Sequence, residues 1–164
     1  MYLLDANVFI QAKNFYYAFD ICPGFWQWID DAASDCGAYS IVKVYDELTA
    51  GGDDLAEWIK QRKDNGGFLA IDDVPTQRAF RRVAGAVQAG SFKPQAKAHF
   101  LSKADPWLVA KAMAENAVVV THEKPARDAV ARVPLPNICA KFGVSYVNTF
   151  ELLQHANASF HLSA

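Results

Sequence analysis

Five short apolar segments divide the chain, and each is a continuous hydrophobic run rather than an alternation of apolar and polar residues. They lie at residues 2–4, 38–40, 68–71, 117–121 and 144–147. Continuous runs of this length are typical of parallel strands that helices cover on both faces. The pattern therefore predicts a central parallel sheet.

The segments between these runs have apolar positions three and four residues apart, which predicts amphipathic helices. We expect helices from just after Asp5 to about residue 13, at 25–33, 40–49, 53–63, 77–89 and 105–116, and from residue 148 onward. Ser40 and Asp105 are the expected N-caps of two of them, and Asn148 and Glu151 have capping-box spacing. Because strands and helices alternate, the predicted fold class is α/β, in a single domain of residues 1–164.

Composition limits the class of protein and its cellular location but indicates no particular partner. The chain is 52% hydrophobic, enough for a core, and its net charge of −2 indicates no particular partner. Three cysteines without a CxxC pair argue against a disulfide framework and a structural zinc site: Cys22, Cys36 and Cys139. No apolar run approaches the roughly 18 residues of a membrane span. Asp5 interrupts the first run, so we expect no signal peptide, a cytoplasmic location and no membrane partner.

Four acidic residues lie at or near the ends of apolar segments. They are Asp5, Glu47, Asp105 and Glu123. In parallel α/β folds, ligands bind at the carboxyl ends of the strands, which is where Asp5 and Glu123 are expected. On the helix that contains Glu47, the apolar stripe lies beside Glu47, whereas Asp46 points nearly opposite. We therefore expect Glu47 to point inward and Asp46 to be solvated.

Converging carboxylates require a counter-charge. Each pair at about 4 Å costs roughly 1 kcal/mol in water and about 4 kcal/mol at an effective dielectric near 20. Mg²⁺ or Mn²⁺ removes this conflict, because hard cations prefer oxygen ligands and also reach phosphate oxygens. Such ions activate water and stabilise the leaving oxygen of a phosphodiester. The residues alone thus indicate metal-assisted hydrolysis of a nucleic-acid backbone.

The same four positions resemble the motifs of PIN-domain nucleases, in family order and over nearly the whole chain. The matching segments are residues 3–10, 44–48, 104–110 and 119–123. They resemble, in turn, a strand ending in Asp with a polar residue two positions later, a helical Glu before Leu, an Asp opening a helix, and a strand ending in Thr, one variable residue and an acid. Asp5, Glu47, Asp105 and Glu123 occupy the acidic positions.

The resemblance implies a three-layer α/β/α sandwich around a central parallel sheet (the PIN-like fold) and a Mg²⁺- or Mn²⁺-dependent endoribonuclease acting on RNA. Many small bacterial members are VapC-type toxins of toxin–antitoxin pairs, held inactive by a cognate antitoxin protein and often homodimeric. It also implies that the four acids are the metal ligands and catalytic residues, with Asn7 and Thr121 as polar supports. One departure is Glu123, where the family more often has Asp; Asp128 is the alternative acid.

Several residues are candidates for substrate binding. A stretch from Val74 to Ala104 has six basic residues and no acid: Arg78, Arg81, Arg82, Lys93, Lys97 and Lys103. This stretch is either a guide for an RNA backbone or an ordinary solvated face. Nearer the predicted site, Lys43, Lys111 and Lys124 are candidates for phosphate contacts.

Histidines and aromatic residues offer a further set of candidates. His122 is either a supporting residue of the site or a surface or core histidine, and His99, His155 and His161 show no ligand spacing. The densest aromatic cluster is either core or a surface for base stacking or antitoxin binding. Its members are Phe15, Tyr16, Tyr17, Phe25, Trp26 and Trp28.

Two other functions fit parts of this pattern. One is a phosphatase with an aspartyl nucleophile at Asp5, but that class needs a second Asp two residues later and Asn7 cannot transfer the proton. The other is a catalytically inactive PIN-like module that only binds protein or RNA. Binding of Mn²⁺ that is lost in Asp5→Asn distinguishes the nuclease from this module.

Overall fold

In a computed structural model, which describes residues 1–160, five strands form one parallel sheet in the order β3-β2-β1-β4-β5. The strands are β1 (Tyr2–Leu4), β2 (Ala38–Ile41), β3 (Phe68–Leu69), β4 (Val118–Val120) and β5 (Tyr146–Val147). β1 lies at the centre, where Leu3 pairs with Tyr39 of β2 on one side and Val119 of β4 on the other. The predicted parallel sheet and all five of its strands are confirmed.

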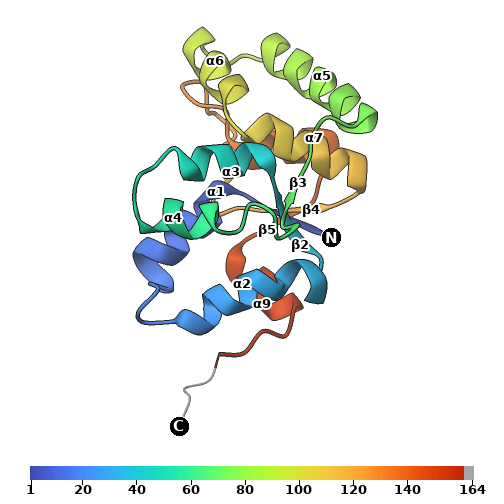
Figure 1. The fold of residues 1–164 in the computed structure, drawn as a ribbon. Coiled ribbons are helices and arrows are strands. Elements are labelled where there is room, and N and C mark those ends of the chain that lie inside the picture. The colour runs from blue at the N-terminus through green and yellow to red at the C-terminus, as the bar shows by residue number, and fades with distance from the viewer. Residues whose placement is uncertain (161–164) are drawn as a thin grey trace.

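Helices cover both faces of this sheet. In chain order they are α1 (Ala6–Gln11), the π-helix η1 (Ala12–Tyr16), α2 (Pro23–Asp35), α3 (Val42–Thr49), α4 (Asp54–Lys60), α5 (Val74–Ala89), α6 (Pro94–Ser102), α7 (Asp105–Glu115), α8 (Leu135–Phe142) and α9 (Thr149–His155). Figure 1 shows α2 and α9 on one side of the sheet and α3 and α7 on the other, with α5 and α6 outside α7. The architecture is therefore the predicted three-layer α/β/α sandwich.

The core has side chains from all three layers. Leu3 and Val119 on the sheet are fully buried, as are Phe25 on α2, Leu108 on α7 and Leu152 on α9. The continuous apolar runs of the strands are explained by this double coverage, because side chains on both faces of the sheet meet a helix. No helix within residues 1–160 combines the length and hydrophobicity of a membrane-spanning segment.

The strand order creates a switch point beside β1. The chain moves outward from β1 to β2 and β3, then returns to the other side of β1 for β4 and β5. In such sheets the crevice between the two diverging halves, at the carboxyl ends of the strands, is where ligands bind. Asp5 follows β1 directly, and Thr121 follows β4, so both flank this crevice.

Three helix starts were expected from capping residues, and one is confirmed. Asn148 and Glu151 form the predicted capping box at α9. Ser40 does not cap α3; its hydroxyl donates to the Leu4 carbonyl at 2.6 Å, because this residue is still part of β2. Asp105 is the first helical residue of α7 rather than its N-cap, which is Ala104.

Three helical segments were not expected from the sequence. The π-helix η1 continues α1 to Tyr16, beyond residue 13 where the predicted helix ended, and α6 and α8 are short helices of nine and eight residues. Helices this short are marginal on their own, so tertiary packing rather than local pattern stabilises them. His161, expected to be structural, lies outside the described residues.

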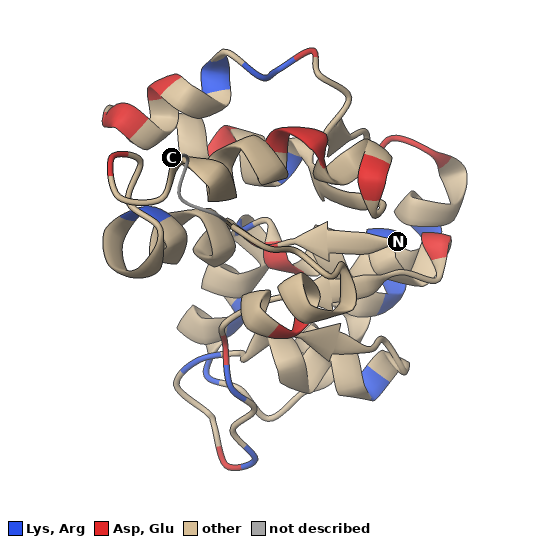
Figure 2. Cartoon of the chain, turned by 90° about the horizontal axis from the view of Figure 1, so that it is seen from below, with Lys and Arg blue, Asp and Glu red and all other residues tan. Residues whose placement is uncertain are grey.

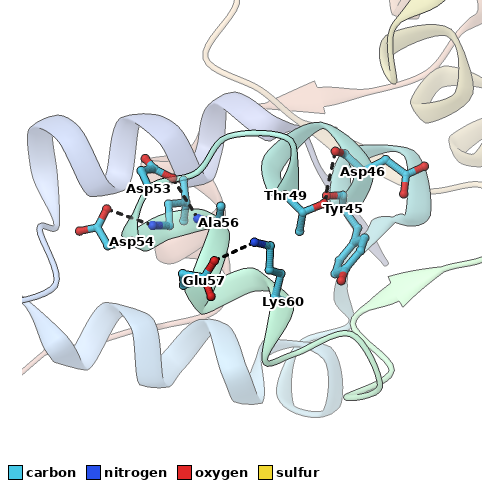
Figure 3. Close-up of polar contacts among 9 residues, drawn as sticks. Tyr45, Asp46, Thr49, Asp53, Asp54, Ala56, Glu57 and Lys60 are labelled. Atoms are coloured by element: carbon cyan, nitrogen blue, oxygen red, sulfur yellow. Dashed lines mark hydrogen bonds and ion pairs between the residues drawn. The ribbon is translucent and has the colours of Figure 1, made fainter.

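Polar contacts order the end of α3 and the start of α4 (Figure 3). The Thr49 hydroxyl donates to the Tyr45 carbonyl at 2.8 Å near the end of α3. Asp53 caps α4 by accepting from the Ala56 N–H, and Lys13 of η1 pairs with Asp53 at 2.7 Å. The ion pair joins η1 to the start of α4, while the Thr49 contact lies within α3, the helix that presents Glu47.

Candidate functional site

Asp5 is buried where β1 ends, with an exposed fraction of 6%. Its main-chain N–H donates to the Val120 carbonyl at 3.0 Å. Its Oδ2 accepts hydrogen bonds from Asn7 Nδ2 at 2.5 Å and from Thr121 Oγ1 at 2.8 Å. The carboxyl ends of β1 and β4 are thus joined through one carboxylate.

Asn7 completes this connection from the first turn of α1. Its Nδ2 also lies 2.9 Å from Thr121 Oγ1, and its Oδ1 accepts the His122 N–H at 3.0 Å. One amide side chain therefore contacts three residues of the site and fixes the loop after β4. Asn7 and Thr121 lie where the sequence predicted two polar supports.

Glu47 joins α3 to the start of α7. Its Oε1 accepts the Ala104 N–H at 3.0 Å, directly before Asp105. Glu47 is half-buried, whereas Asp46 is exposed and lies 3.8 Å from Lys43. The predicted orientation of these two neighbouring acids is confirmed.

Glu123 lies in the loop after β4 and contacts the start of α8. Its Oε2 accepts the Leu135 N–H at 2.9 Å. Asp105 and Glu123 line the same cavity of about 310 Å³, together with His99 and Arg132. Asp128, the alternative acid, is exposed and lines a different cavity. Glu123 rather than Asp128 therefore lies in the same cavity as Asp105.

Two of the carboxyl groups have strongly raised pKa values. Burial, together with the nearby charges of Asp5, Glu123 and Glu47, raises the pKa of Asp105 to about 8. Burial likewise raises the pKa of Asp5 to about 6, against the lowering effect of the Thr121 hydrogen bond, and Glu123 and Glu47 add to the rise. The four predicted acids therefore act on one another electrostatically at one edge of the sheet.

The chemistry of these donors fits a hard divalent cation, because buried oxygen ligands repel one another without a counter-charge. Within residues 1–160, no Lys or Arg forms an ion pair with any of the four acids. As placed, however, no three His, Cys, Asp or Glu side chains of the described residues converge tightly enough to hold an ion. Glu47 and Glu123 are instead directed to backbone N–H groups, so an ion here needs water ligands or a turn of these side chains.

His122 follows Thr121 at the edge of the site, and its ring contacts Thr149 and Tyr16. Its Nε2 is 2.7 Å from Thr149 Oγ1, and its ring lies nearly parallel to the ring of Tyr16. Burial lowers the pKa of His122. The ring is therefore neutral at physiological pH, while the main chain of His122 belongs to the Asn7 network.

The predicted phosphate-binding residues are distributed over different surfaces. Arg78 and Arg82 line a cavity of about 750 Å³ with Val118 and Ser145, at the amino ends of β4 and β5. This is the edge of the sheet opposite to Asp5. Arg81 is exposed on the same helix. The interpretation of this arginine cluster as a guide toward the acids is therefore not supported by its placement.

Lys111 is buried and forms ion pairs within the fold. It is 6% exposed, and its Nζ lies 2.9 Å from both Asp73 Oδ2 and Glu115 Oε1. A lysine held by two carboxylates is not available to a phosphate. Lys124 is exposed beside Glu123, and Lys43 lines a shallow groove with Glu47 and Lys103.

Basic and acidic positions are spread over many elements rather than gathered on one face (Figure 2). This distribution agrees with the net charge of −2. Arg132 was missed by sequence reasoning, because only the folded loop before α8 brings it to the cavity of Asp105 and Glu123. No local motif marks it.

The fold and the crevice at its switch point define the class: the chain has the three-layer PIN-like α/β/α fold. It belongs to the family described as "Domain of unknown function (DUF4411)", whose model matches residues 2–160. FitAcB from Neisseria gonorrhoeae has a similar structure, with a TM-score of 0.52 and 18% sequence identity, covering 92% of this chain and 99% of that one. At this identity the likeness shows the fold alone. No curated protein matches the chain.

Proposed function

We propose that this protein is a Mg²⁺- or Mn²⁺-dependent endoribonuclease. The observation that carries the proposal is the set of four acids from β1, α3, α7 and the loop after β4, in which the charges of Glu47 and Glu123 raise the pKa values of Asp5 and Asp105 at the switch point of the sheet. Carboxylates concentrated in this way without a neighbouring cation are costly to the fold, and a bound divalent ion removes that cost. The resemblance to PIN-domain nucleases in sequence and fold supports the same conclusion.

The chain's own residues would have two roles: the acids would hold the ion, and other polar residues would orient the acids. Buried Asp5 and half-buried Asp105 would supply two carboxylates, while Glu47 and Glu123 would complete the set. Asn7 and Thr121 hold Asp5 in one orientation through its Oδ2. A bound ion would activate a water and stabilise the oxygen that leaves the phosphodiester.

The biological role that fits best is the toxin of a type II toxin–antitoxin pair. This part of the proposal comes from the family resemblance and the PIN-like fold, and implies a cognate antitoxin protein as partner. Induced expression should arrest bacterial growth, and Asp5→Asn or Asp105→Asn should relieve the arrest. Arrest that persists in both variants at equal protein level would contradict the assigned site.

The biochemical test uses purified protein and single-stranded RNA. We expect cleavage with Mn²⁺, none with EDTA, and a loss of at least 100-fold in Glu47→Gln, the order seen when a catalytic electrostatic contact is removed. Asp46→Asn is the matched control, because it removes a carboxylate one residue away that is exposed. Equal losses in the two variants would mean that the effect is not specific to the site.

A second function is favoured by one observation. Glu47 and Glu123 each accept a backbone N–H, at 3.0 and 2.9 Å, as purely structural carboxylates do. A catalytically inactive module that binds RNA or protein would need no more than this. Such a module would bind RNA equally well with Mn²⁺ or EDTA and would leave the RNA intact.

A further inference from the structure

An exposed group of aromatic rings lies next to the acids and has no part in the proposed chemistry. We call it the ring platform, and its members are Phe15, Tyr16, His122 and Phe150. Phe15 is 75% exposed, Tyr16 52% and Phe150 41%. These rings are therefore not core residues, although the sequence groups Phe15 and Tyr16 with aromatic residues that are.

The ring platform is an ordered arrangement rather than a scatter of side chains. The rings of Tyr16 and His122 are nearly parallel, with centroids 6.3 Å apart and an angle of 25°. Phe150 meets both edge-on, at 5.2 and 6.0 Å. The contact between His122 Nε2 and the Thr149 hydroxyl fixes the imidazole. Tyr16, His122 and Phe150 thus contact one another, and the rings of Tyr16 and Phe150 remain open to solvent.

The π-helix η1 produces this exposure. Its wide turn directs Phe15 and Tyr16 outward, whereas Tyr17 at its end turns inward and stacks on Phe25, with centroids 4.3 Å apart. Segments of π-helix occur frequently at functional sites, since they are less stable than α-helix and persist where they position a residue. The turn here positions two aromatic rings at the surface.

The ring platform and the candidate site share residues. The main-chain N–H of His122 donates to Asn7 Oδ1, and the same Asn7 amide donates to Asp5 Oδ2. Glu123 follows His122 in the chain. The ring platform is therefore joined to Asp5 through Asn7 and to Glu123 through the chain.

We propose that the ring platform stacks against an unpaired base of the RNA, beside the bond that the acids cleave. This inference rests on the proposed function and makes single-stranded RNA the substrate. Every base presents a π-face to an aromatic ring, and stacking of this kind is independent of sequence. The connection of these flat rings to Asp5 and Glu123 favours a base of the RNA over a protein partner, because an RNA bound for cleavage lies at the acids.

The first test measures RNA binding without cleavage, in the Asp5→Asn protein. Fluorescence anisotropy of a labelled 12-nucleotide single-stranded RNA measures binding to this protein with Tyr16 unchanged and with Tyr16→Ala, Tyr16→Leu or Tyr16→Trp. We expect about tenfold weaker binding for Ala and for Leu, and unchanged or tighter binding for Trp, because only an aromatic ring stacks. Ile21→Ala is the matched control, since Ile21 is 76% exposed and lies outside the ring platform.

The second test locates the stacked base. One nucleotide at a time is replaced by an abasic residue. We expect about a tenfold loss at one position with Tyr16 present and no further loss there in Tyr16→Ala. Full RNA affinity in Tyr16→Leu would overturn the stacking inference and indicate an apolar surface for a protein. The same conclusion would follow if the loss from the abasic residue and the loss from Tyr16→Ala added in full. RNA cleavage by the wild type alongside equal RNA binding by Tyr16→Ala would overturn this inference alone. A wild type that neither binds nor cleaves RNA would overturn the proposed function as well.

Discussion

At the scale of single residues, the candidate site combines carboxylates that repel one another with polar groups that hold them in place. Asp105 and Asp5 have pKa values of about 8 and 6 because burial and the charges of neighbouring carboxylates disfavour their ionised forms. Asn7 and Thr121 oppose this tendency at Asp5 by donating hydrogen bonds to it. The fold therefore retains an arrangement that is unfavourable without a cation, as functional sites often do.

The first prediction concerns the stability of the metal-free protein. The pKa of Asp105 rises from 3.8 to about 8 on folding, so the folded state binds its proton more tightly. The free energy of unfolding should then fall as pH rises from about 4 to about 8. Asp105→Asn should remove this loss and be more stable than wild type by about 1–3 kcal/mol at pH 8 in EDTA, with a much smaller gain at pH 4. Urea unfolding at both pH values measures it; equal stability at pH 8 would contradict the assignment.

The second prediction concerns Asn7, whose amide contacts Asp5, Thr121 and His122. Asn7→Ala should lower the free energy of unfolding by about 1–3 kcal/mol, because it leaves partly buried groups without their hydrogen bonds. Asn14→Ala is the control, since Asn14 is exposed on the neighbouring η1. If both variants unfold at the same urea concentration, Asn7 does not hold the site together.

At the scale of elements, one ion-pair cluster joins the outer helices to the layer that carries Asp105. Lys111 of α7 contacts Asp73, which is the N-cap of α5, and Glu115 on its own helix. Hydrogen bonds from Thr76 and Lys111 lower the pKa of Asp73 to about 2, although its partial burial acts in the opposite direction. This cluster fixes α5 against α7 and so the direction in which α7 presents Asp105.

The third prediction follows from this cluster. Lys111→Ala should lower the free energy of unfolding by about 1–2 kcal/mol at pH 7, a value reduced because Asp73 and Glu115 are partly exposed. Because the pKa of Asp73 is lowered on folding, its stabilisation is present above about pH 4 and lost as pH falls toward 2. The difference in free energy of unfolding between Lys111→Ala and the wild type should therefore shrink as pH falls toward 2, which urea unfolding at both pH values measures.

RNA cleavage per folded molecule should be unchanged in Lys111→Ala, since both partners of this lysine are structural. A specific loss of cleavage with unchanged stability would instead return Lys111 to the substrate-binding residues that the sequence suggested.

At the scale of the whole molecule, the sequence predicted the sheet and the edge at which the acids gather, because both depend on local patterns. The apolar runs ending in Asp5 and Thr121 placed these residues at the carboxyl ends of parallel strands, and helix periodicity separated Glu47 from Asp46. The position of α5 against α7 depends on tertiary packing. The pattern therefore could not show that Arg78 and Arg82 lie at the opposite edge, nor that Lys111 is buried between two carboxylates.

The same limit applies to the parts of the site that no motif marks. The contacts of Glu47 and Glu123 are with backbone groups of Ala104 and Leu135, which are distant in sequence and belong to segments joined only by folding. The outward turn of Phe15 and Tyr16 depends on the π-helix η1, whose hydrogen bonding has no sequence pattern as regular as that of an amphipathic α-helix.

The most direct test of the central claim, that the four acids form one metal site, is Mn²⁺ binding by isothermal titration calorimetry at pH 7.5. We predict that the wild type binds Mn²⁺ and that each of the four substitutions weakens binding at least tenfold, the lower end of the effect of losing even an indirect partner of a metal. These substitutions are Asp5→Asn, Glu47→Gln, Asp105→Asn and Glu123→Gln. Asp46→Asn and Asp128→Asn, which remove exposed carboxylates nearby in the sequence, should bind as the wild type does. A wild type that does not bind Mn²⁺, or equal affinity in all six variants, would contradict the account.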